Sequence, residues 1–201
     1  MSFEKYLSNK KALIITLDDA LYPKKDYLLQ VYYLFSEFMA YSEQIDAKAI
    51  VDFMSKEYAE NGEQSIFAKT ATQFGIPEKY EQNFNLLFET ARLPLKLLLF
   101  QNVLELLQQV VLDRKQLFIL VDGNPAEAIN KIKQIEWNGL EQYLKLYFTA
   151  EYHNSANEAV IELLKEQSLE KDEVVLFFAK NQPESNFVDA DIECFSVTEI
   201  L

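Results

Sequence analysis

The sequence predicts an α/β protein with a Rossmann-like parallel sheet flanked by helices and an all-helical segment inserted after the first strand. Three observations favour this fold class. Short apolar runs alternate with amphipathic stretches over residues 97–201, an earlier long stretch shows only helical periodicity, and glycine is scarce, at 4 of 201 residues. Strands that alternate with helices are joined by crossover connections, which produce a parallel sheet.

The first strand is predicted at residues 12–17, a continuous apolar and partly β-branched run that ends at Asp18 and Asp19. A run of this length is typical of a strand buried on both faces of a sheet. Residues 25–92 then carry apolar side chains at helical spacing without strand-like alternation.

The alternation of strands and helices resumes near residue 97, so the predicted core is discontinuous. We expect an α/β core made of residues 1–21 plus 97–201, and a helical cap at residues 22–96. The later elements are expected in the order helix (about 99–112), strand (117–121), helix (about 126–135), strand (144–148), helix (about 157–165), strand (174–178) and strand (193–197).

The turn after the second strand has recognisable local chemistry. Pro125 suits the first position of a helix and Asn124 suits the helix cap. Gly123 is expected to take a dihedral that other residues avoid. Lys131 and Lys133, farther along the same helix, are expected on its solvated face.

Charge and composition exclude several classes of function. The net charge of −13 repels a phosphate backbone, so we expect no nucleic-acid partner. The most apolar stretch, residues 93–112, is interrupted by polar residues and predicts an amphipathic helix, so no membrane association is expected. The single cysteine, Cys194, permits no disulfide within the chain, and with no signal pattern at the start this favours a cytoplasmic protein.

The segment Ile14-Ile15-Thr16-Leu17-Asp18-Asp19-Ala20-Leu21-Tyr22-Pro23 resembles the first motif of the haloacid dehalogenase superfamily, a strand that ends in Asp-x-Asp-x-Thr. The resemblance implies a hydrolase core with a helical (C1-type) cap. It places the family nucleophile at Thr16, the general acid/base at Asp18 and the family threonine at Ala20. Two of these three positions therefore lack the family residue.

The remaining motifs follow in the family order and are similarly degenerate. Phe118-Ile119-Leu120-Val121-Asp122-Gly123-Asn124-Pro125 resembles the second motif, with Val121 where a Thr or Ser holds the phosphoryl group. The family lysine is expected near Tyr152-His153-Asn154-Ser155, where Asn154 and Ser155 stand instead. Phe177-Phe178-Ala179-Lys180-Asn181-Gln182-Pro183 resembles the last motif, with Ala179 and Pro183 in place of its two aspartates.

The family chemistry needs a carboxylate nucleophile and a Mg²⁺ ion held by carboxylate oxygens. The resemblance leaves only the backbone carbonyl of Asp18 as a metal ligand, so we expect no metal and no cofactor. This favours an inactive pseudo-phosphatase that binds a small molecule or a protein partner. The residues predicted to line its pocket are Asp19, Val121, Asp122, Gly123, Asn124, Asn154, Ala179 and Lys180.

The alternative is an active phosphate-monoester hydrolase with a rearranged acidic site, in which Asp18, Asp19 and Asp122 hold Mg²⁺. Each position also has a structural interpretation. Asp18 and Asp19 would cap the turn by accepting from backbone N–H groups, and Asp122 would shape the strand-to-helix turn. Thr16 would likewise be a strand residue whose hydroxyl bonds locally.

Three further side chains near the predicted site have similar alternatives. Lys180 would bind an anion, pair with Asp18 or simply lie on the surface. His153, the only histidine, is expected to be exposed. Glu184, one position past the expected late aspartate, would reach the pocket after a register shift, or lie at a solvated helix start, which we favour.

Overall fold

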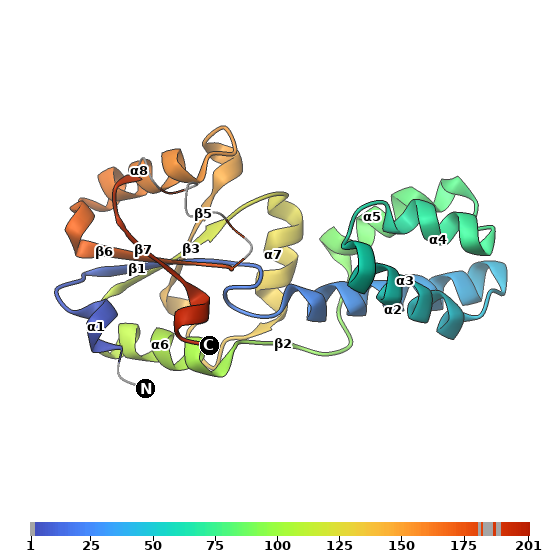
Figure 1. The fold of residues 1–201 in the computed structure, drawn as a ribbon, viewed down its shortest axis with the longest axis horizontal. Helices are drawn as coiled ribbons and strands as arrows, with labels where there is room; N and C mark the ends of the chain where they lie inside the picture. Colours follow the sequence, from blue (N-terminus) through green and yellow to red (C-terminus); the bar gives the residue numbers. More distant parts are fainter. Residues whose placement is uncertain (1–2, 181, 183–186, 188–189) are drawn as a thin grey trace. The chain divides into compact units, whose positions relative to one another are not determined.

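The computed structural model describes residues 3–180, 182, 187 and 190–201. The chain divides into two compact units (Figure 1). The α/β unit contains the chain up to Lys24, Leu97–Ala128 and the chain from Ile135 onward, whereas the helical unit contains Lys25–Lys96 and Ile129–Gln134. The sequence did not predict that Ile129–Gln134 groups with the helices. A role of these helices as a cap stays a prediction.

The α/β unit is built on a five-stranded parallel sheet with the strand order β5-β3-β1-β6-β7. Its strands are β1 (Ala12–Thr16), β3 (Gln116–Val121), β5 (Leu144–Phe148), β6 (Val174–Phe178) and β7 (Glu193–Ser196). All residues of β1 and β6 are buried, as expected for central strands covered on both faces. The predicted α/β fold class and its parallel sheet are confirmed.

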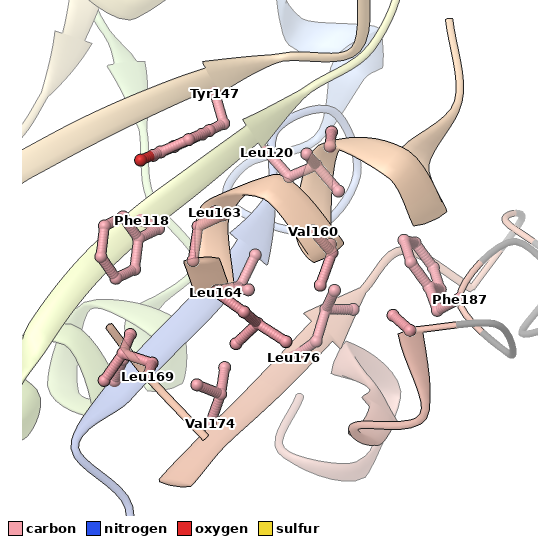
Figure 2. Packing of buried hydrophobic residues seen from close by; sticks show 14 of the residues in the cluster. Phe118, Leu120, Tyr147, Val160, Leu163, Leu164, Leu169, Val174, Leu176 and Phe187 are labelled. Atoms are coloured by element: carbon pink, nitrogen blue, oxygen red, sulfur yellow. The ribbon is translucent and has the colours of Figure 1, made fainter. Parts of the chain in front are cut away.

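Helices cover both faces of this sheet. They are α1 (Glu4–Leu7), α6 (Gln101–Leu112) and α8 (Ala156–Gln167). Helix α7 (Pro125–Gln134) begins in the α/β unit and ends in the helical unit. Side chains alternate between the two faces along a strand, so Ile14 and Leu176 project to the face that α8 covers. There they pack with Val160 and Leu163 of α8 in one apolar cluster (Figure 2). On the other face, Tyr6 of α1 lies edge-on to Phe177 of β6, with ring centroids 5.2 Å apart.

Besides the end of α7, the helical unit contains α2 (Lys24–Glu43), α3 (Ala47–Asn61), α4 (Ile66–Phe74) and α5 (Glu81–Thr90). Its centre is aromatic. The ring of Phe84 lies 5.0 Å from that of Phe35, 5.7 Å from that of Phe67 and 5.2 Å from that of Phe88. Four rings from three helices thus pack together in the core of this unit.

The expectation for Lys131 was wrong, whereas that for Lys133 is confirmed because Lys133 is exposed. The side chain of Lys131 is buried, and its Nζ lies 4.9 Å from the centre of the Tyr27 ring. The cause is that Ile129–Gln134 packs with the helical unit. This packing buries a face of α7 that the sequence predicted to be solvent-exposed. An ammonium over an aromatic face is partly compensated for its lost hydration.

Short elements were not predicted. Helix α1 has one turn, and β2 (Leu97–Leu98) pairs in parallel with β4 (Ile135–Glu136) through two residues each. Elements of this length contain too few residues to show a period. Among the helices that the structure describes, none is both long enough and apolar enough to cross a membrane.

Candidate functional site

The predicted site residues gather where β1, β3 and β6 end. Thr16 is the last residue of β1 and pairs with Leu120, next to Val121 at the end of β3. On the other side of β1, Ile15 pairs with Phe177, so Ala179 follows directly beyond the β6 end. The carboxyl ends of parallel strands are where open α/β sheets bind ligands. The fold therefore brings Thr16, Val121 and Ala179 to one edge of the sheet.

Thr16 is buried, and its hydroxyl accepts a hydrogen bond from the backbone N–H of Ala179, with 3.2 Å between Oγ1 and N. The same N–H also lies 3.3 Å from Oε1 of Gln182. The Thr16 hydroxyl was predicted to bond locally, whereas its partner lies 163 residues farther along the chain. The bond links the ends of β1 and β6 at the two positions where the resemblance places side-chain carboxylates.

The two aspartates after β1 have separate partners. Oδ1 of Asp18 accepts a hydrogen bond from the Tyr22 hydroxyl at 2.6 Å, and Tyr22 is fully buried. Asp19 has a positive φ of 58° and accepts from the backbone N–H of Lys24 at 2.9 Å. The predicted bond to a backbone N–H is confirmed for Asp19. For Asp18, the tyrosine hydroxyl is a partner that the sequence did not suggest.

The turn after β3 is organised by Asp122 and Asn124. Oδ1 of Asp122 accepts from the Gly123 N–H at 2.9 Å and from the Thr149 hydroxyl at 2.8 Å. Gly123 has a φ of 82°, as predicted for this position. The Asn124 side chain accepts from the N–H groups of Ala126 and Glu127, which confirms it as the cap of α7 with a proline in the first turn.

Sequence reasoning did not find Thr149, which is buried directly after β5. The signal that could have identified Thr149 is its position directly after a predicted strand. A polar residue that follows a strand of the same parallel sheet lies at the same edge as the residues that follow the other strands. The bond to Asp122 shows that this edge extends across β3 to β5.

The segment near the missing lysine forms a turn before α8. Asn154 has a φ of 58°, and its N–H donates to the Thr149 carbonyl at 2.9 Å. Ser155 caps α8 by accepting from the N–H of Glu158. His153 is exposed, as predicted, with its Nδ1 2.9 Å from Oε2 of Glu158. Lys180 is exposed beyond the end of β6. Pro183 and Glu184 lie outside the described residues.

The donor set at the strand ends does not fit Mg²⁺, which prefers near-octahedral coordination by oxygens that include carboxylates. Ala179 has no side-chain oxygen, and the Thr16 oxygen already accepts a hydrogen bond. Within the residues that the structure describes, no three Asp, Glu, His or Cys side chains are grouped so that they could share a metal ion. Asp18, Asp19 and Asp122 therefore do not form the three-carboxylate site of the alternative hypothesis.

Comparison with known proteins identifies the fold. No family model matches the sequence, and no curated protein does. Solved structures, in contrast, match the fold of this chain. A candidate β-phosphoglucomutase from Thermotoga maritima is similar over 95% of this chain and 96% of its own, with a TM-score of 0.59 and 15% identity.

Two other solved structures agree with this likeness. A defluorinating L-2-haloacid dehalogenase covers 92% of this chain and 80% of its own, with a TM-score of 0.58 and 11% identity. A HAD family hydrolase from Deinococcus radiodurans R1, solved with bound phosphate and sodium, covers 94% of this chain and 81% of its own, with a TM-score of 0.57 and 12% identity. At these levels of sequence identity, structural similarity shows the fold alone, and the chemistry has to be argued from the residues of the site. The chain has the fold of the haloacid dehalogenase superfamily.

Proposed function

We propose that this protein is a catalytically inactive pseudo-phosphatase that acts by binding a small molecule or a protein partner. The observation that carries the proposal is the hydrogen bond between the Thr16 hydroxyl and the Ala179 N–H. It occupies the two positions at which the resemblance calls for carboxylates. A threonine and an alanine supply neither the nucleophile nor the metal ligands of the hydrolase chemistry.

The groups that remain at the strand ends support the same proposal. A threonine hydroxyl is a weak nucleophile unless a base activates it. The nearest retained carboxylate in sequence is Asp18, which accepts a hydrogen bond from Tyr22. Stabilisation of the charge that develops in the transition state is usually the largest catalytic contribution. At the strand ends, Val121 and Ala179 have apolar side chains that cannot stabilise such a charge.

A binding role fits what the fold retains. The strand ends still meet at one edge, where open α/β sheets hold their ligands. The hydrolase from Deinococcus radiodurans, which shares the fold, was solved with bound phosphate. We propose that the same edge binds a ligand in this protein without turnover.

A phosphatase screen tests the proposal. The purified protein is incubated with Mg²⁺ and a panel of phosphate monoesters that includes p-nitrophenyl phosphate, and we expect no turnover above the buffer background. The matched control is Asp18→Asn, which keeps the shape of the side chain. Metal-dependent turnover that Asp18→Asn abolishes would overturn the proposal and favour a rearranged acidic site.

A further inference from the structure

A second surface lies away from the strand ends. A groove of about 630 Å³ is lined by residues of α1 and the turn after it and by residues of α6 and the turn after it. These two turns lead into β1 and β3, so the groove flanks the amino ends of the strands. The lining residues are Phe3, Glu4, Leu7, Ser8, Asn9, Glu105, Gln108, Gln109, Leu112, Asp113 and Lys115.

The charges in the groove are predominantly negative. Glu4, Glu105 and Asp113 contribute three carboxylates, against one ammonium from Lys115. The Lys115 ammonium is hydrogen-bonded within the protein, since its Nζ donates to the carbonyls of Leu7 at 2.8 Å and Lys10 at 2.7 Å. The same two bonds fasten the end of α1 to the turn after α6. Among the lining residues that the structure describes, the one cation thus bonds to the backbone of α1 and the turn after it, and the carboxylates make the groove acidic toward a ligand.

Apolar surface accompanies these charges. Phe3 and Leu7 are buried, whereas 75% of Leu112 is exposed to solvent. An exposed leucine beside carboxylates is suited to a partner that offers both an apolar side chain and a cation. The net charge of −13 adds a long-range attraction for basic partners.

The length of the groove along α6 suits a short stretch of extended chain. Its α6 wall extends from Glu105 to Asp113, which is about 12 Å at a rise of 1.5 Å per residue. An extended peptide covers that length with about four residues.

We propose that this groove binds a short, extended, basic segment of a partner protein, with arginine or lysine side chains facing the carboxylates and an apolar side chain against Leu112. The inference rests on the proposed binding role and names a partner class for it. It assigns that partner to the amino ends of the strands, which leaves the opposite edge to a separate ligand.

The test uses the full chain and fluorescein-labelled hexapeptides that contain four arginines and two leucines in every order. Binding is measured by fluorescence anisotropy at an ionic strength of about 0.15 M, at which the Debye length is about 8 Å. We expect at least one peptide to bind, and the matching glutamate–leucine peptides not to bind. The groove variant Glu105→Gln with Asp113→Asn keeps the carbonyl acceptors for Gln101 and Gln109 and removes two charges. We expect it to weaken the best peptide about tenfold.

The matched control is Glu136→Gln with Glu141→Gln, which removes two exposed carboxylates outside the groove lining. It changes the net charge equally, so we expect less than about a twofold effect because distant surface charges are screened by salt. Leu112→Asn reports on the apolar contact and is expected to weaken binding as well. The inference is overturned if no peptide binds, or if the groove variant and its control weaken binding equally.

Hydrolysis of p-nitrophenyl phosphate with Mg²⁺ is measured on the same samples. Turnover with intact peptide binding would contradict the proposed inactivity and leave the groove standing. Absence of both turnover and peptide binding would contradict the groove alone.

Discussion

The Thr16 hydroxyl accepts a hydrogen bond from the Ala179 N–H, at a distance of 3.2 Å between Oγ1 and N. Two carboxylates at these positions would repel each other unless a cation lay between them. A hydroxyl that faces a backbone N–H carries no negative charge, so no cation is needed between these two positions. The relationship explains how the ends of β1 and β6 are joined at these two positions by a neutral hydrogen bond.

Replacing Thr16 tests this link between β1 and β6. Thr16→Val keeps the shape of the side chain and removes the acceptor of the Ala179 N–H. We expect unfolding free energy to fall by about 1 kcal/mol, since Gln182 remains as a second acceptor of the same N–H. Urea denaturation measures the change. Thr72→Val, at an exposed threonine of α4, is the control, and an equal effect of both substitutions would refute the structural role of Thr16.

The bond between Asp122 and Thr149 predicts coupling across the strand ends. A double-mutant cycle with Asp122→Ala and Thr149→Val should give a coupling energy of about 1 kcal/mol, because each single change already removes the 2.8 Å hydrogen bond. Stability is measured by chemical denaturation of the four proteins. Strictly additive effects would show that the bond contributes nothing to the folded state.

The cap of α7 predicts a second local effect. Asn124→Ala removes the acceptor of the Ala126 and Glu127 N–H groups and should cost about 1 kcal/mol of stability. Asn124→Asp keeps a capping oxygen and should retain most of the stability. Thermal unfolding followed by circular dichroism measures both. Equal losses for the two variants would contradict the assignment of the cap.

Glu173 predicts a pH effect at the amino ends of the strands. A side-chain hydrogen bond from Lys11 and a backbone hydrogen bond from Glu170 lower the pKa of Glu173 below its ordinary value. A carboxyl whose pKa is lower in the folded state stabilises the fold above its unfolded pKa and loses that contribution as pH falls through the folded pKa. Lys11→Gln should therefore raise the pKa of Glu173, as followed by NMR of its side-chain carboxyl. An unchanged pKa would contradict the pairing.

Sequence periodicity predicted the sheet well because its strands are short, apolar and buried. The boundaries of β5 and β6 agree with the prediction, and the local chemistry of Gly123 and Asn124 followed from turn and cap preferences. Burial of Lys131 could not be predicted, because it arises from packing against residues remote in sequence, such as Tyr27.

For the candidate site, the sequence predicted where the residues lie along the strands but not which groups they contact. Motif order located Thr16, Asp18 and Ala179 at strand ends, since those positions follow from the pattern of apolar runs. The hydrogen-bond partners were accessible only from the structure. Tyr22 and Thr149 are each held near their aspartates by the geometry of turns, and side-chain direction in a turn is not determined by spacing alone.

The central proposal is that the protein holds no magnesium ion, because the positions of two carboxylate ligands are taken by Thr16 and Ala179. Isothermal titration with Mg²⁺ tests it on the wild-type protein, on Asp18→Asn and on the combined variant Thr16→Asp with Ala179→Asp. We predict no binding to the first two and clear binding to the third, whose new carboxylates would face each other at the ends of β1 and β6. Magnesium binding to the wild-type protein that Asp18→Asn abolishes would contradict the account.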